Sequence, residues 1–173
     1  GFCILEDNYY TSEIHISNAY VQGAAYLYEG QTATSTTIKA GGVINGFCIL
    51  EDNYYTSGIH VSNAYVNYKN AYLYEGQTAT STTVNSGRMI VSSGGSATST
   101  TVNLGGDMLV SSGGYAISTT VNFGGDMSVG GGSVTATMVN SGGQIRVTSG
   151  GSAITTTVNS GGQMWGDSGA KIT

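Results

Sequence analysis

The C-terminal half of the chain repeats one pattern of apolar and polar positions about every 19 residues. Thr-Val-Asn at positions 83–85 returns at 101–103, 120–122 and 157–159, and as Met-Val-Asn at 138–140. Two glycine turns in each unit separate a longer segment from a shorter one. These segments are rich in Val, Ile, Thr, Ser and Met and are too short for helices, so they predict β-strands. Glycine pairs supply the positive φ angles that tight corners need.

Within a unit, the apolar residues stand mostly at alternating positions, apart from a shift near Thr100 and Thr101. The same kinds of residue return one unit later: Ala97, Val102, Met108 and Val110 are followed by Ala116, Val121, Met127 and Val129, and later by Ala153, Val158 and Met164. Stacking the units about 4.8 Å apart would bury each apolar edge against the next unit and pair the backbone. We therefore predict an all-β, right-handed single-stranded parallel β-helix (a β-solenoid) with about eight or nine turns of about 19 residues. One file of side chains would form an asparagine ladder: Asn85, Asn103, Asn122, Asn140 and Asn159.

The N-terminal part contains a near-exact duplication. GFCILEDNYYTS at positions 1–12 returns at 46–57, and AYLYEGQTATSTT begins at Ala25 and again at Ala71. We interpret residues 1–76 as duplicated, tyrosine-rich units of about 45 residues, each forming about two turns with a longer loop, and residues 77–173 as the regular repeats. A separate small β domain is the alternative for the N-terminal part.

Cys3 and Cys48 occupy equivalent positions in the duplication. If each copy forms two turns, the two cysteines lie about 9–10 Å apart, whereas a disulfide needs Cα atoms within about 7 Å. Two unpaired thiols are expected in that case. If one copy forms one long turn, a disulfide becomes possible.

Composition narrows the classes of function. The chain has 173 residues, a net charge of −5, 28 glycines, no proline and only 9 % charged residues. An acidic chain with five basic residues lacks the positive surface that holds phosphate backbones, so nucleic-acid binding is not expected. No apolar run is long enough to span a membrane, and no signal-peptide pattern is visible, so any export signal is expected outside this segment.

The residues give little support to an enzyme. His15 and His60 lie in alternating apolar segments, where an outward-facing strand histidine is the simplest interpretation. The regular half has only Asp107, Asp126 and Asp167 as acids, too few for the groove of a pectin-cleaving β-helix. Its glycine–aspartate segments also lack the second half of the calcium-binding nonapeptide repeat. We predict no catalytic residue, no cofactor and no metal site.

The unit S-G-G-x-A-x-x-x-T-V-N-S-G-G-x-M-x-V is seen at 93–110, with leucine for the second serine, and at 149–164. It resembles the AIDA-type repeat of AIDA/TibA-type self-associating autotransporter adhesins. The resemblance covers about residues 77–165 and, in part, 31–42; the block GFCILEDNYYTS has no match in that motif. It implies the non-enzymatic passenger of a Gram-negative autotransporter, exported through the periplasm and attached to the outer membrane by a translocator domain outside this chain. It further implies adhesion to host cells, autoaggregation and biofilm formation, with a host-cell receptor or another copy of the chain as partner.

Several members of that family carry heptose on Ser and Thr, added by dedicated heptosyltransferases, so the resemblance makes such an enzyme a partner and this chain its acceptor. The acceptors implied are serines of the S-G-G and S-S-G-G turns: Ser86, Ser93, Ser112, Ser141, Ser149 and Ser160. Ser86 departs from the motif because Arg88 replaces the second glycine, and Leu104 and Phe123 replace serine at the same turn. Serine also favours turns for purely local reasons.

A second function stays open, a polysaccharide-degrading or polysaccharide-binding β-helix protein. For an adhesin, self-association is expected through the neutral Ser, Thr and Asn faces, because acidic faces would repel each other.

Overall fold

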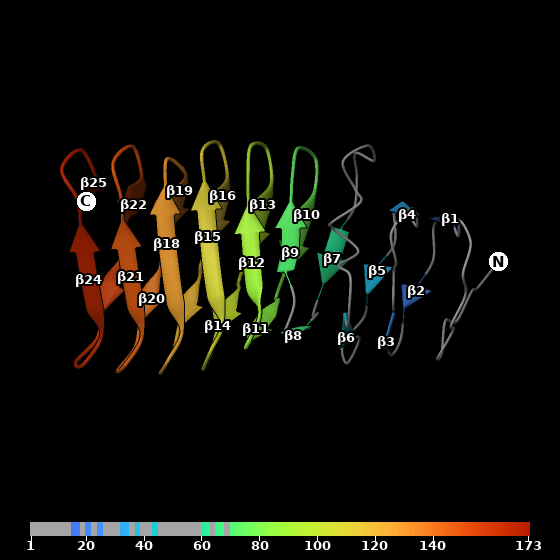
Figure 1. Cartoon of the computed structure of the whole chain (residues 1–173), viewed down its shortest axis with the longest axis horizontal. Helices are drawn as coiled ribbons and strands as arrows, with labels where there is room; N and C mark the ends of the chain where they lie inside the picture. Colours follow the sequence, from blue (N-terminus) through green and yellow to red (C-terminus); the bar gives the residue numbers. More distant parts are fainter. Residues whose placement is uncertain are drawn as a thin grey trace.

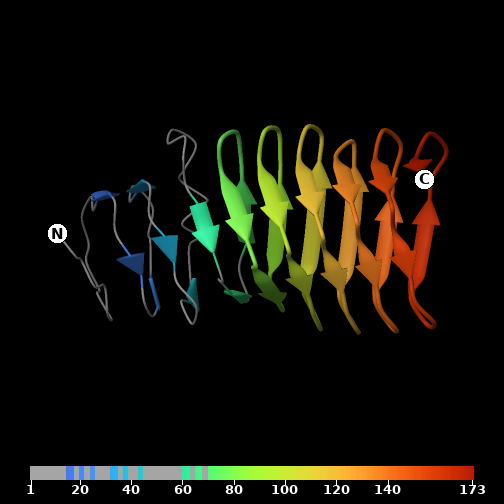
Figure 2. The same cartoon turned by 180° about the vertical axis from the view of Figure 1, so that it is seen from behind.

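The computed structural model describes residues 70–173 continuously. Before residue 70 it describes the side chain of Val66 and the backbone of short strands at 15–17, 20–21, 24–25, 32–34, 37–38, 43–44, 60–62 and 65–67. Every helix or strand in this part of the chain is a β-strand, and no helix capable of crossing a membrane occurs there. The strands pile up along one axis into a rod, with the C-terminus at one end (Figures 1 and 2).

Each turn of the rod supplies three strands, and equivalent strands of successive turns form three sheets, here called sheets 1, 2 and 3. Sheet 1 contains β7 (His60–Ser62), β10 (Thr78–Thr80), β13 (Ser96–Thr98), β16 (Tyr115–Ile117), β19 (Ser133–Thr135), β22 (Ser152–Ile154) and β25 (Lys171–Ile172). Sheet 2 contains β3 (Ala24–Ala25), β6 (Val43–Ile44), β8 (Tyr65–Asn67), β11 (Thr83–Asn85), β14 (Thr101–Val102), β17 (Thr120–Val121), β20 (Met138–Val139) and β23 (Thr157–Val158). Sheet 3 contains β9 (Asn70–Leu73), β12 (Arg88–Val91), β15 (Asp107–Ser111), β18 (Asp126–Gly130), β21 (Gln144–Val147) and β24 (Gln163–Gly166). Two further pairs join β1 (His15–Ser17) to β4 (Thr32–Thr34) and β2 (Tyr20–Val21) to β5 (Thr37–Ile38).

The register of the sheets confirms the predicted β-solenoid. All the strand pairs are parallel, and Ala97 pairs with Ala116, Val102 with Val121 and Met108 with Met127. Residues 78–166 make about five complete turns, spaced about 19 residues apart. The right-handed sense, the total of eight or nine turns and the division of the chain at residue 76 stay predictions.

The core follows from the alternation of side chains along each strand. In sheet 3, one inward file holds Met89, Met108, Met127 and Ile145, and a second holds Val91, Val110, Val129 and Val147. Sheet 2 adds Val84, Val102, Val121 and Val139, and sheet 1 adds Ala79, Ala97, Ala116, Val134 and Ala153. All of these side chains are buried. Because no turn can cover its own apolar edge, each turn depends on its neighbours for stability.

The asparagine ladder is also confirmed. The side-chain amide of each asparagine donates a hydrogen bond to the side-chain oxygen of the one before it, at 2.7 to 3.0 Å from Asn85 to Asn159. The ladder stands at the end of sheet 2, beside the corner that leads to sheet 3. It therefore links successive turns through side-chain hydrogen bonds in addition to the backbone ladder.

The corner between sheets 1 and 2 has no glycine, although its backbone is left-handed. On successive turns it is occupied by residues with φ of 54 to 56°: Ser81, Ser99, Ser118, Ala136 and Thr155. This left-handed residue explains the break in alternation near Thr100, because it re-aims the next side chain into the rod. The next residue is a threonine on each turn.

These threonines carry an unusual set of hydroxyl groups. The Oγ1 atoms of Thr82, Thr100, Thr119, Thr137 and Thr156 are all buried and have no hydrogen-bond partner among the described residues. A buried hydroxyl without a partner costs about 1–3 kcal/mol. This file is therefore a place where stability can be gained.

We expect Thr119→Val to raise the free energy of unfolding by about 1 kcal/mol, because valine keeps the β-branched shape and removes the unpaired hydroxyl. Urea denaturation followed by circular dichroism measures the change. The control is Thr120→Val on the adjacent, half-buried and outward-facing residue, where a change within about 0.5 kcal/mol is expected. A loss of stability at Thr119 alone would show that its hydroxyl makes a stabilising bond.

Candidate functional site

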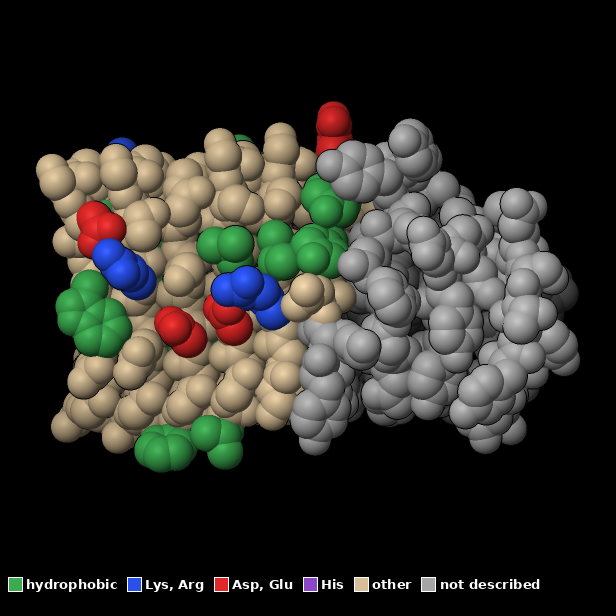
Figure 3. All heavy atoms as spheres, viewed as in Figure 1, with side chains coloured by type: hydrophobic (Ala, Val, Ile, Leu, Met, Phe, Trp, Pro, Cys, Tyr) green, Lys and Arg blue, Asp and Glu red, His purple; other side chains and the backbone are tan. Residues whose placement is uncertain are grey.

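The outer face of sheet 3 gathers charged side chains of both signs (Figure 3). Along one outward file, Arg88, Asp107, Asp126 and Gln144 follow one another on β12, β15, β18 and β21. These residues share a face because strand positions two apart point the same way and the turns stack in register. Arginines lie among the aspartates on this face, so it carries charges of both signs.

Arg88 and Asp107 form an ion pair through the arginine Nε, at 2.5 Å from a carboxylate oxygen. Asp126 is the next residue of the file and has no basic partner of its own among the described residues. Its partial burial, and then the neighbouring Asp107 carboxylate, raise the pKa of Asp126, while the Met127 backbone and Arg88 act in the opposite direction. Asp126 is therefore a carboxyl group whose charge is poorly compensated.

A second outward file of sheet 3 changes character along the rod. It starts with Tyr72, Ile90 and Leu109 and continues with Ser128, Arg146 and Trp165. The ring of Tyr72 stacks on that of Tyr74, with centroids 6.0 Å apart. One end of this face is thus apolar and the other end polar, with a single indole.

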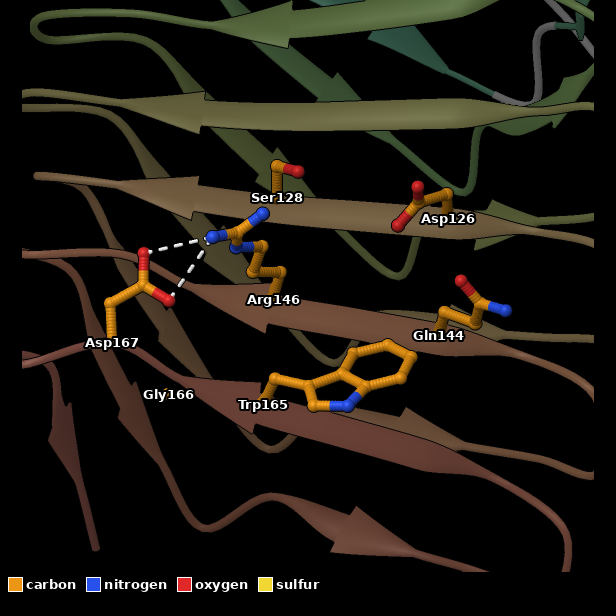
Figure 4. Close-up of a pocket in the computed structure, with 7 residues that line it drawn as sticks. All are labelled: Asp126, Ser128, Gln144, Arg146, Trp165, Gly166 and Asp167. Atoms are coloured by element: carbon orange, nitrogen blue, oxygen red, sulfur yellow. Dashed lines mark hydrogen bonds and ion pairs between the residues drawn. The ribbon is translucent and has the colours of Figure 1, made fainter.

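The polar end is hollowed. A depression of about 580 Å³ is lined by Asp126, Ser128, Gln144, Arg146, Trp165, Gly166 and Asp167 (Figure 4). One terminal nitrogen of Arg146 donates to both carboxylate oxygens of Asp167, each at 3.2 Å. Figure 4 shows Trp165 on β24 beside Arg146 and Gln144 of β21, with Ser128 and Asp126 on the strand beyond. Three successive turns therefore build this hollow.

The sequence did not predict this grouping. In the sequence analysis, Asp107, Asp126 and Asp167 entered only as acids too few to form a catalytic groove. The structure places all three on the sheet 3 side of the rod, and Asp126 and Asp167 line the same hollow. Asp107 and Asp167 are each paired with an arginine. No short motif could reveal the hollow, since its residues are contributed by turns 18 or 19 positions apart.

The serines implied as glycosylation acceptors lie elsewhere, at the corners. All six are exposed: Ser86, Ser93, Ser112, Ser141, Ser149 and Ser160. Three of them, Ser93, Ser112 and Ser149, stand at the corner between sheets 3 and 1, here called corner 3–1. Ser141 and Ser160 stand at the corner between sheets 2 and 3, here called corner 2–3. The six serines therefore form two groups, with Ser86 as the exception.

The exception is Ser86. Its φ is 52°, and it takes the place that Gly105 (φ 71°) takes on the next turn, because this corner is one residue shorter. A Cβ atom built on Gly105 would lie 3.1 Å from the Oγ of Ser86. Ser86 therefore has the positive φ of the first glycine, although it lies beside the left-handed glycine of the next turn as Ser141 does beside Gly161.

Corner 2–3 combines apolar and polar residues in one file. Leu104 and Phe123, 64 % and 70 % exposed, precede Ser141 and Ser160 at the equivalent position, each just before a glycine of positive φ. Corner 3–1 has a further exposed serine, Ser168, which the S-G-G motif misses because Ala170 rather than a second glycine follows Gly169. A search of the sequence for Ser-Gly, rather than for S-G-G, would have found it.

The expectations for the two histidines and two cysteines concern side chains outside the described residues. His15 and His60 begin β1 and β7, but their side chains, like Cys3 and Cys48, lie outside the described residues, so these expectations stay predictions. Within the described residues, no group of three or more histidine, cysteine, aspartate or glutamate side chains is placed to hold a metal ion.

No protein-family model matches the chain, and no curated protein matches it. Among solved structures, the chain is similar to the crystal structure of a hyper-glycosylated TibA fragment, whose glycosylation was catalysed by TibC. The identity is 22 %, the TM-score is 0.36, and the match covers 99 % of this chain and 97 % of that one. This level of superposition assigns no role to any residue of the present chain.

Proposed function

We propose that the chain is part of a non-enzymatic bacterial adhesin, an autotransporter passenger that acts at the cell surface in host-cell adhesion, autoaggregation and biofilm formation. The AIDA-type repeats of residues 77–165 suggest this function. The observation that carries it furthest is the alignment of exposed serines along corners 3–1 and 2–3 of a stiff rod. A rod that repeats the same surface at each turn can add many weak contacts, so its strength comes from valence rather than from one deep pocket.

We propose in addition that the corner serines accept heptose from an autotransporter heptosyltransferase. Four of them each lie beside the left-handed glycine of the following turn: Ser93, Ser112, Ser141 and Ser149. A Cβ on Gly113 would lie 3.1 Å from Ser93 Oγ, and a Cβ on Gly169 would lie 2.9 Å from Ser149 Oγ. Because those glycines have no side chain, the following turn can pack closely against the serine while the serine side chain stays exposed. Successive acceptors would then stand about 4.8 Å apart wherever adjacent turns both carry serine.

Co-expression with such a heptosyltransferase is expected to add mass in steps of one heptose residue, detected by intact mass spectrometry. Replacing Ser93, Ser112 and Ser149 by alanine should remove the increments of corner 3–1, and replacing Ser141 and Ser160 those of corner 2–3. Ser118→Ala is the matched control, since Ser118 is exposed but not followed by glycine, and Ala136 takes its place one turn later. An unmodified mass in every preparation would contradict the acceptor role.

The adhesive role has its own test. Beads coated with the chain are expected to bind cultured epithelial cells and to clump with one another, whereas beads coated with albumin should do neither. Release of fragments from acidic polysaccharides incubated with the chain would instead support the polysaccharide-degrading alternative and remove the non-enzymatic assignment.

A further inference from the structure

The hollow on sheet 3 has polar groups whose hydrogen-bonding capacity is not used within the protein. In the part of the chain that the structure describes, the Ser128 hydroxyl, the Gln144 amide and the Trp165 indole N–H have no hydrogen-bond partner. The amide and the hydroxyl can each donate and accept, and the indole can donate. This set suits a ligand that carries several donors and acceptors close together.

Trp165 gives the hollow a flat apolar surface. It is the only tryptophan of the chain and is 48 % exposed. A large aromatic side chain with one polar atom is characteristic of recognition sites, because its ring packs against an apolar surface while its N–H remains available. A pyranose ring matches this arrangement, since it presents a face of C–H groups surrounded by hydroxyl groups.

The remaining side chains of the hollow are charged: Arg146, Asp167 and Asp126. Arg146 contacts both carboxylate oxygens of Asp167 through one terminal nitrogen, so its other guanidinium N–H groups remain available to a ligand. Asp126 adds a carboxylate that accepts hydrogen bonds. Two carboxylates against one guanidinium leave an excess of negative charge, which disfavours acidic sugars and phosphate groups.

The volume and shape also fit a sugar. About 580 Å³ lies within the range of small-ligand sites. The hollow is a depression on the outer face of a sheet, so a chain of sugars can extend beyond it along the rod (Figures 3 and 4).

We propose that this hollow binds a unit of a neutral polysaccharide, with the pyranose ring on the indole of Trp165. Gln144, Ser128 and Asp126 hydrogen-bond the sugar hydroxyls, and Arg146, paired with Asp167, donates to a further hydroxyl or ring oxygen. The hollow borders corner 3–1 at Asp167, but none of the six serines implied as acceptors lines it, so its binding and heptosylation can be tested with separate variants.

Electrophoresis of the folded chain through native gels that contain yeast mannan, dextran or galactomannan tests the proposal. We expect at least one of these neutral polysaccharides to retard the chain, and polygalacturonate to retard it less. Because Trp165 is the only tryptophan, titration with the retarding polysaccharide should also change the tryptophan fluorescence in a saturable way. The absence of retardation by all three neutral polysaccharides, or stronger retardation by polygalacturonate, would overturn the proposal.

Variants distinguish binding in the hollow from nonspecific binding to the protein surface. Trp165→Ala should weaken binding about tenfold or more, as expected for an aromatic anchor, and Trp165→Tyr should restore part of it. Gln144→Ala, with the indole intact, should weaken binding and reduce the fluorescence change. Phe123→Ala removes a more exposed aromatic ring at corner 2–3 and should leave binding unchanged. Binding by Trp165→Ala equal to that of the parent chain, with unchanged circular dichroism, would refute the site; the corner-serine variants test heptosylation separately.

Discussion

Replacing Gly125 by alanine is expected to lower the free energy of unfolding by about 3 kcal/mol. Gly125 is the buried second glycine of corner 2–3, and a Cβ atom there would stand 2.5 Å from the carbonyl oxygen of Val102 on the preceding turn. The carbonyl carbon of Val102 and the oxygen of Asn122 would lie at 3.0 and 3.1 Å. These are backbone atoms of hydrogen-bonded turns, so relief requires two turns to separate. Urea denaturation measures the loss.

Gly130→Ala is the matched control. Its Cβ would meet only Thr148 Oγ1, at 3.4 Å, and its φ is not positive. Alanine there is expected to be neutral or to stabilise by up to about 1 kcal/mol, because it restricts the unfolded chain. Equal effects at Gly125 and Gly130 would show that spacing between turns does not set the requirement for glycine.

Met127→Ala is expected to lower the free energy of unfolding by about 2–5 kcal/mol. Met127 is fully buried in an inward file of sheet 3, between Met108 and Ile145. Truncation leaves a cavity, and neighbouring turns cannot collapse into it because the strand ladder fixes their spacing. The midpoint of urea denaturation is the measurement.

The control is the same methionine-to-alanine substitution at an exposed position. Met138 points outward from sheet 2 and is 44 % exposed, so Met138→Ala should change the free energy of unfolding by less than about 1 kcal/mol. Hydrogen exchange should show that Met127→Ala weakens protection first in β15, β18 and β21, since repeat units depend on their nearest neighbours. Uniform loss of protection along the rod would contradict this local coupling.

The expected effects of Gly125→Ala and Met127→Ala depend on features that the sequence repeat already indicated. The 18- to 19-residue period placed Met108 above Met127 and Val102 above Val121, and the register confirms it. The asparagine ladder followed from the same period. These features were predictable because one sequence position repeats at each turn, so the sequence itself shows which residues share a file.

The corners were less predictable. The left-handed residue between sheets 1 and 2 is serine, alanine or threonine rather than glycine, so composition gives no signal for it. The position of Ser86 could not be predicted either, because a one-residue deletion at its corner moves it to the glycine position. The neighbouring turns impose both conformations through backbone hydrogen bonds.

By itself, the sequence determined the all-β solenoid, its period, its core files and its ladder, because each of these repeats a residue type at a fixed interval. Only the tertiary structure decided which unlike residues meet on the outer face. Asp126, Arg146 and Trp165 belong to different turns and do not recur together elsewhere along the described rod, and they form one hollow because parallel stacking brings their strands side by side.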